Sequence, residues 1–218
     1  MARQLLTQVD NVNPGYGHRL TLSTKSYDAT VNTRDALITA ATDLLDGGGV
    51  DAVTLREVGR RAGVSHNAPY KHFADKQALL AAVAARELAE FARSVRLTEA
   101  ERRTPGTALK AITLNYVAWS LRHPQRFRLV FGPWTAESAE LTEQAETSWS
   151  AMVAAVAAAQ RSGALPAGDP HRVAALIRAT AHGAVALALT GHLDASGKGH
   201  ANPDDLVHDL FDHLLGAR

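Results

Sequence analysis

From Thr33 to the end of the chain, apolar residues recur at the spacing of a helix almost without interruption. Alternation of apolar and polar residues, which marks a strand because successive strand residues face opposite sides, never persists. Hydrophobic residues make up 46% of the 218 residues, which is enough to build a core. The sequence therefore predicts an all-α fold with about nine helices.

Capping and terminating residues set the limits of these helices. Asp75, Asp169 and Asn202 each stand where an N-cap is expected, the last two directly before a proline. The glycine run 47–49 is expected to end the first helix. The predicted helices span about residues 34–45, 54–62, 66–73, 75–96, 105–123, 125–131, 137–161, 170–189 and 203–215.

The second and third of these helices are short and are separated by a tight turn. Thr54 and Glu57 have the spacing of a capping box, and Gly63 fits a left-handed cap at the end of the second helix. Ser65 is expected to cap the third helix. Two short helices joined by a turn that contains glycine are the signature of a helix-turn-helix motif.

Basic charge gathers on this motif. Residues 54–76 hold five basic and two acidic side chains, a balance of +3, whereas the whole chain carries +1. Lysine and arginine neutralise phosphates and release counterions, which supplies most of the affinity for DNA that does not depend on sequence. An ordinary solvated helix face is the alternative interpretation of the same charges.

Base edges in the major groove are read by the first residues of the recognition helix. These residues are His66, Asn67 and Ala68. Asparagine can bond N6 and N7 of adenine together, and alanine can touch a thymine methyl group. Lys71, one turn after Asn67, and Arg56 have the chemistry to contact guanine or phosphate.

The segment 54–80 resembles the TetR family of transcriptional regulators. The resemblance rests on three motifs in this sequence, which are Ala62-Gly63-Val64-Ser65, Tyr70-Lys71-His72-Phe73 and Lys76-Gln77-Ala78-Leu79. It implies phosphate contacts from Thr54, Tyr70, His72 and Lys76, and side chains of these types do donate to phosphate oxygens. His72 has a structural alternative, as a histidine that caps a helix. The full expected set of DNA contacts is Thr54, Arg56, Ser65, His66, Asn67, Ala68, Tyr70, Lys71, His72 and Lys76.

The remaining two thirds of the chain is similar to the family in layout. Residues 1–31 are polar and show no sustained helical period, so a flexible N-terminal arm is expected there. The resemblance implies a three-helix DNA-binding domain at 32–76 and a helical ligand-binding and dimerisation domain at 77–218. Ala181-His182-Gly183 resembles a subgroup whose C-terminal domain carries a Trp…His-Gly signature, with Arg178 in the region of the tryptophan. The family implies a cytoplasmic homodimer that binds pseudo-palindromic double-stranded operator DNA, and a repressor released by a small molecule.

Aromatic residues gather in the central helices, as expected for a largely apolar ligand pocket with a few polar groups. The alternative is that they fill an ordinary helical core. The expected pocket residues for a small, largely apolar effector are Tyr116, Trp119, Phe127, Phe131, Trp149, Met152 and His182.

Dimerisation is expected through the last two long helices. The segment 170–189 carries the stripe Leu176, Ile177, Thr180, Ala184 and Leu187, and the segment 203–215 carries Leu206, Leu210 and Leu214. Two copies of this pair can form a four-helix bundle about a two-fold axis. The same stripes would also serve the core of a single chain.

Several classes of function are not expected. The chain has no cysteine, and its ten histidines include no pair at the i, i+4 spacing of a helical zinc site, so we expect no metal and no cofactor. No catalytic motif occurs, and no uninterrupted apolar run is long enough to cross a membrane. Glutamates at 137, 140, 143 and 146 indicate a solvated acidic face or, alternatively, one that attracts cationic ligands. The rival hypothesis is a helical enzyme or ligand carrier whose helix-turn-helix-like end serves packing.

Overall fold

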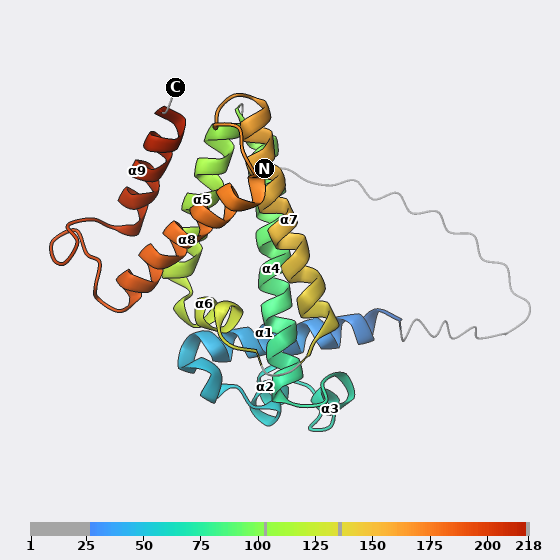
Figure 1. Ribbon diagram of the computed structural model, residues 1–218. Helices are drawn as coiled ribbons and strands as arrows, with labels where there is room; N and C mark the ends of the chain where they lie inside the picture. The colour runs from blue at the N-terminus through green and yellow to red at the C-terminus, as the bar shows by residue number, and fades with distance from the viewer. Residues whose placement is uncertain (1–26, 103, 135–136, 217–218) are drawn as a thin grey trace, which may run out of the picture.

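The computed structural model describes residues 27–102, 104–134 and 137–216. These residues form nine α-helices and no strand, with one isolated bridge between Asp194 and Gly199 (Figure 1). The all-α prediction is therefore confirmed. The helices are α1 (Tyr27–Ala52), α2 (Leu55–Arg61), α3 (Ala68–His72), α4 (Lys76–Glu101), α5 (Pro105–Arg122), α6 (Pro124–Phe131), α7 (Ala139–Arg161), α8 (Pro170–Leu189) and α9 (Pro203–Gly216).

The first helix is longer than predicted at both ends. α1 begins at Tyr27 and runs past the first two glycines of the run 47–49, with the break in helical geometry at Gly49 (φ 70°, ψ −170°). The prediction that the glycine run ends the first helix is confirmed at Gly49, where the backbone leaves helical geometry and a short second helical segment follows up to Ala52. The flexible arm predicted for residues 1–31 lies outside the described residues up to residue 26, and 27–31 belong to α1.

The helix-turn-helix forms with one change at its second helix. Thr54 caps α2 by accepting a hydrogen bond from the Glu57 backbone N–H, and Gly63 has the left-handed φ of +67° that lets the chain turn. The predicted cap at Ser65 was wrong, because a turn closed by the Ala68 N–H and the Ser65 carbonyl precedes α3. His66 and Asn67 therefore lie in the turn ahead of the helix.

Close contact between α2 and α3 depends on a glycine facing a proline. A Cβ atom on Gly59 would lie 2.8 Å from Cγ of Pro69, closer than such atoms approach in proteins. Phe73, predicted as core, is buried at the end of α3 and lies under the Arg34 guanidinium. The two short helices thus hold one fixed relative position on the first helix.

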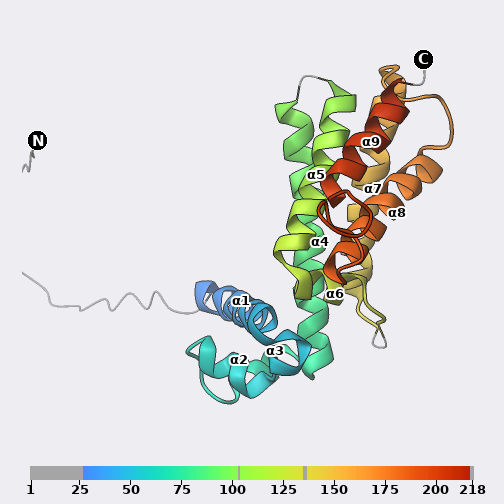
Figure 2. The same cartoon turned by 90° about the vertical axis from the view of Figure 1, so that its left-hand side faces the viewer.

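Two apolar clusters make up the interior, and α4 belongs to both of them. Its first half places seven consecutive buried residues, 79–85, in a cluster with α1, α2 and the end of α6. Its second half contributes Val95 to a cluster with α5, α7, α8 and α9. At 1.5 Å per residue α4 is about 39 Å long, and it runs beside α7 for most of that length (Figures 1 and 2).

α8 has a composition that also suits a membrane span. It is 20 residues long and apolar enough to cross a membrane, by length and composition only. Of the 18-residue window that meets this criterion, 28% is buried inside the protein. The apolar residues of α8 are interrupted by polar ones, so no uninterrupted apolar run marks this helix in the sequence. α8 packs on α5, α7 and α9, so in this structure it is a layer of the C-terminal domain.

Candidate DNA interface and ligand cavity

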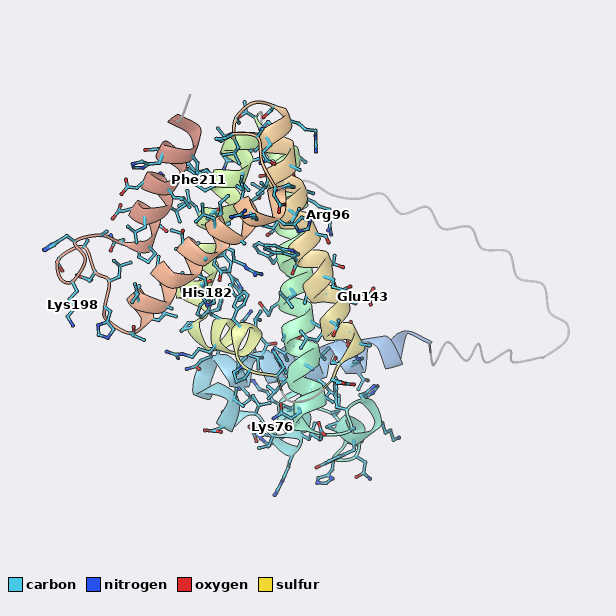
Figure 3. All side chains as sticks on the ribbon, viewed as in Figure 1. Lys76, Arg96, Glu143, His182, Lys198 and Phe211 are labelled. Atoms are coloured by element: carbon cyan, nitrogen blue, oxygen red, sulfur yellow. The ribbon has the colours of Figure 1, made fainter. Side chains whose placement is uncertain are left out.

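The predicted DNA contacts lie at one end of the molecule. They come from the start of α2, the turn, α3 and the start of α4, where Lys76 is labelled in Figure 3. Tyr70 is 52% exposed, an unusual value for a tyrosine beside a core. The exposed members of the predicted set are Thr54, Arg56, Ser65, His66, Asn67, Tyr70 and Lys71, while Ala68, His72 and Lys76 are half-buried.

Two of the five cations in this region have partners within the protein. Arg60 pairs with Glu57, and this hydrogen bond holds the pKa of the Glu57 carboxyl below its usual value. Arg61 pairs with Asp43 of α1 at 3.5 Å. In the part of the chain that the structure describes, the other three basic residues, Arg56, Lys71 and Lys76, form no ion pair. Their charge remains for an external anion.

Local contacts arrange the polar side chains near the turn. The His66 ring lies 6.1 Å from the Tyr70 ring, and its Nδ1 is 3.3 Å from the Asn67 side-chain oxygen. Thr54 uses its hydroxyl oxygen as an acceptor, which leaves the O–H free to donate to a phosphate. His72 makes no side-chain hydrogen bond to a described residue, so the structure gives no support to its capping role.

A cavity of about 590 Å³ lies in the C-terminal domain. Its walls come from α4, α5, α7, α8 and the end of α6. Apolar and aromatic side chains dominate them, as in small-molecule sites of this size. Five of the predicted pocket residues line the cavity, namely Tyr116, Trp119, Phe131, Trp149 and Met152.

The other two predicted pocket residues lie behind that wall. The centres of the Phe127 and His182 rings lie 4.7 Å apart with the rings tilted, and Nδ1 of His182 is 2.9 Å from the Tyr116 hydroxyl. Burial raises the pKa of Tyr116 well above its ordinary value, so it remains a neutral phenol. Desolvation and the charge of Arg178 lower the pKa of His182. Phe127 and His182 thus support Tyr116 from behind and do not themselves line the cavity.

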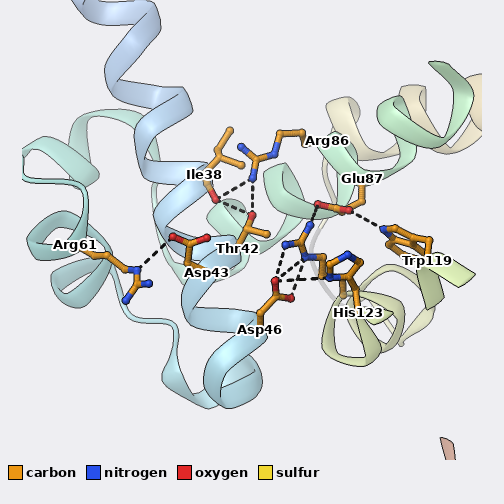
Figure 4. Close-up of polar contacts among 10 residues, drawn as sticks. Ile38, Thr42, Asp43, Asp46, Arg61, Arg86, Glu87, Trp119 and His123 are labelled. Atoms are coloured by element: carbon orange, nitrogen blue, oxygen red, sulfur yellow. Dashed lines mark hydrogen bonds and ion pairs between the residues drawn. The ribbon is translucent and has the colours of Figure 1, made fainter. Parts of the chain in front are cut away.

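A chain of polar contacts links the cavity to the DNA-binding end. The Trp119 indole N–H donates to Glu87 of α4 at 3.2 Å, and Glu87 also accepts from Arg126 of α6 at 3.3 Å. Arg126 in turn binds both carboxylate oxygens of Asp46 on α1, with Nε 2.9 Å from Oδ1 (Figure 4). We call Trp119, Glu87, Arg126 and Asp46 the cross-domain chain.

A second set of contacts fixes α4 against α1. Arg86 donates to the hydroxyl oxygen of Thr39 at 2.9 Å. It also donates to the hydroxyl oxygen of Thr42 at 2.6 Å and more weakly to the Ile38 carbonyl (Figure 4). Half-burial lowers the pKa of Arg86, although the group stays charged. The start of α4 therefore cannot rotate on α1 without breaking hydrogen bonds.

Sequence reasoning missed the cross-domain chain. Asp46 and Arg126 are 80 residues apart, and no local pattern connects two such side chains. Arg178 departs from the subgroup signature in the sequence, and the structure places it on the cavity wall. The glutamates of α7 are exposed, as a solvated face would be, and Glu140 pairs with Arg34 of α1.

Two family models match the chain. One, described as bacterial regulatory proteins of the tetR family, covers residues 37–83. The other, described as a tetracyclin repressor-like C-terminal domain, covers residues 109–215. Together they span the helix-turn-helix and the domain that holds the cavity.

Individual proteins resemble the chain over most of its length. An uncharacterised HTH-type transcriptional regulator of Mycobacterium tuberculosis (strain H37Rv) is 31% identical over 154 residues, which is 67% of this chain and 76% of the relative. A solved structure from Rhodococcus sp. RHA1, of unknown function, has a TM-score of 0.73 at 30% identity and covers 91% of this chain and 98% of that one. SmeT, the repressor of the Stenotrophomonas maltophilia multidrug efflux pump SmeDEF, has a TM-score of 0.60 at 25% identity, covering 86% and 91%.

Proposed function

Because the chain belongs to the TetR family of bacterial regulatory proteins, and is therefore a transcriptional regulator, we propose that it acts as a cytoplasmic repressor without enzymatic activity. As a homodimer it binds a pseudo-palindromic operator, and a small molecule in the cavity releases it. The observation that carries this proposal is the cross-domain chain, which joins a wall of the cavity to the helix supporting the helix-turn-helix. SmeT, which is described as a repressor, supports repression rather than activation as the mode of control.

The DNA contacts divide into two kinds. Thr54, Tyr70 and Lys76 hold phosphates, with His72 beside them, and these contacts set the position of the protein on the duplex. Asn67 reads a base from the turn ahead of α3, together with its neighbours His66 and Ala68. Two such heads on one dimer must stand about 34–36 Å apart, one turn of DNA, or somewhat more.

The dimer forms through α8 and α9, with a corrected set of residues on α8. Ile177 and Ala184, predicted at the interface, are buried in the core of one chain. Leu176 and Leu187 are 50% and 47% exposed, and their eleven-residue spacing is close to three helical turns, so they share one face. A face of this kind buried against its copy gives a four-helix arrangement about a two-fold axis.

Control works by a change in the spacing of the two reading heads. A ligand that fills the cavity pushes Trp119 against Glu87 of α4, which shifts the Glu87–Arg126–Asp46 contacts and moves α1 and α4 together with the helix-turn-helix. The ligand must bind the form that does not fit DNA more tightly, since equal affinity for both forms shifts nothing. A coupling of about 1–3 kcal/mol weakens operator affinity about 5–150-fold.

Gel shifts of the full-length protein on DNA upstream of its own gene, followed by selection from genomic fragments, test the DNA assignment. Lys76→Ala and Tyr70→Phe should weaken binding to all sequences about equally. Asn67→Ala should relax the base preference at a cost of about 1–3 kcal/mol. Unchanged affinity and unchanged preferred sequence in Asn67→Ala would contradict the assignment of this residue.

The cavity assignment has its own test. Trp119→Ala should abolish the response of the operator complex to an inducing compound and leave DNA binding without ligand intact. Trp134, which packs in the other apolar cluster and does not line the cavity, provides the control variant Trp134→Phe. A Trp119→Ala protein that responds normally would place the effector elsewhere. Failure to bind any DNA, with a small molecule still bound or turned over, would favour the ligand carrier or enzyme.

A further inference from the structure

The charges around the cavity do not cancel in the described part of the chain. Two glutamates line it, and both have partners, since Glu87 binds Arg126 and Glu90 binds Arg93. Arg122 and Arg178 also line it, and neither forms an ion pair with any residue in 27–102, 104–134 or 137–216. The mainly apolar cavity is thus lined by two arginines whose positive charges no described acidic side chain neutralises.

Arg178 is held at the cavity by an aromatic ring. Its guanidinium carbon lies 4.3 Å from the centre of the Trp149 ring, well within the range of a cation–π contact. Such a contact uses the face of the flat guanidinium group, while its five N–H donors lie in the plane of the group and point outward. No described residue accepts a hydrogen bond from these donors. The side chain is therefore oriented, and its donors are free for a planar anion.

The charge of Arg178 reaches into the wall of the cavity. It acts on both Tyr116 and His182, the hydrogen-bonded pair on the adjoining helices. Apolar surface on the same cavity wall comes from Trp119, Met152 and Ile177. The site thus offers an oriented cation together with aromatic and aliphatic surface.

We propose that the effector is an amphipathic organic acid, whose carboxylate binds the guanidinium of Arg178 and whose apolar body fills the cavity between α5, α7 and α8. A carboxylate matches the fork of N–H donors of arginine in geometry and charge. This inference rests on the proposed function, because it takes the cavity to be the effector site. The sequence alone predicted a largely apolar effector, whereas the cavity indicates an apolar compound that carries a carboxylate.

Matched pairs of probes test the proposal on the full-length dimer near neutral pH, where the acids are ionised. The pairs are decanoate with 1-decanol, and 2-naphthoate with 2-naphthalenemethanol, measured by calorimetry and by the fluorescence of the tryptophans in the wall. We expect the acid of at least one pair to bind about tenfold more tightly than its alcohol, since hydrogen bonds to charged groups contribute more than neutral ones. Arg178→Gln should remove that preference and leave the alcohol affinity unchanged.

Two controls separate this effect from damage to the fold. Arg172→Gln changes an exposed arginine on the same helix that does not line the cavity, and it should keep the preference for the acid. Arg178→Lys keeps the charge without the fork, and it should retain part of the preference. Unchanged melting temperatures in all three variants establish that they are folded.

Each outcome decides the question. Equal affinity for acid and alcohol, a preference that survives Arg178→Gln, or no binding of any probe overturns the proposal. The same probes added to an operator complex test the proposed function separately. If alcohols and acids bind equally and release DNA, the cavity is the effector site, but the proposed preference for an acid is wrong. An acid that binds through Arg178 but leaves DNA affinity unchanged would support the ligand class and contradict control by release.

Discussion

Removal of Arg126 tests the energetic weight of the contact between the two domains. The Arg126 side chain is 20% exposed and lies between Asp46, at 32%, and Glu87, at 8%. Arg126→Met keeps most of the aliphatic volume and removes both ion pairs. The variant leaves the Glu87 carboxylate nearly buried, with the Trp119 N–H as its remaining donor among the described residues.

The expected loss follows from the burial of the two acids. The pair with Asp46 is about one-third exposed and contributes about 1 kcal/mol at most. An uncompensated charge at Glu87 costs about 2 kcal/mol, because desolvation is no longer offset. The unfolding free energy should therefore fall by about 3 kcal/mol, and Tm by about 6–12 °C for a chain of this length. Adding Glu87→Gln to Arg126→Met should recover about half of the loss.

Urea unfolding followed by tryptophan fluorescence measures these changes, with all variants at one protomer concentration because a dimer gains stability with concentration. Arg93→Met is the matched control, since its pair with Glu90 is more than half exposed on both sides and should contribute under about 0.5 kcal/mol. A loss below about 1 kcal/mol in Arg126→Met would show that Glu87 is not left as an uncompensated buried charge. So would a double variant with Glu87→Gln that is no more stable than the single one.

Three further predictions concern other parts of the molecule. Gly59→Ala should lower the unfolding free energy by about 1–3 kcal/mol, because its Cβ would meet Pro69, and the added change Pro69→Ala should restore it; equal loss in both proteins in the same urea assay would contradict this. His182 has a pKa below the unfolded value of 6.5, so the unfolded state takes up the proton first, and stability should fall as the pH drops below about 6.5, with a shallower fall in His182→Asn in thermal melts across that range. Leu176→Glu with Leu187→Glu should give monomers by light scattering at micromolar concentration, and dimers of this double variant would place the interface elsewhere.

Most helix limits could be predicted because they depend on capping interactions between residues that are close in sequence. Asp75 and Asp169 cap α4 and α8 as expected, through backbone N–H groups of residues two or three positions later. The start of α3 could not be predicted from the same chemistry, because Ser65 has a capping side chain but the chain closes a turn there instead. Adjacent side chains and backbone groups compete in such short segments.

Faces and partners were harder to predict than helices. Leu176 and Ile177 are both apolar neighbours on α8, yet one is half exposed and the other fully buried. Helical spacing alone assigns both to the same broad stripe, and only packing against α5 and α7 distinguishes them. The aromatic residues were predicted to line a cavity, but the sequence could not distinguish a cavity from a packed core. A filled core and a lined cavity have the same composition.

The sharing of α4 between two apolar clusters limits how this regulator can be taken apart. A cut after residue 76 would remove all seven buried residues at 79–85 from the apolar cluster that contains Leu37 and Leu45. The operator-reading end is therefore not portable as a fragment of the predicted length. A chimera that transplants it onto another sensor domain must carry α4 to at least Ala85, and must also supply a substitute for Leu129 and Val130 of α6.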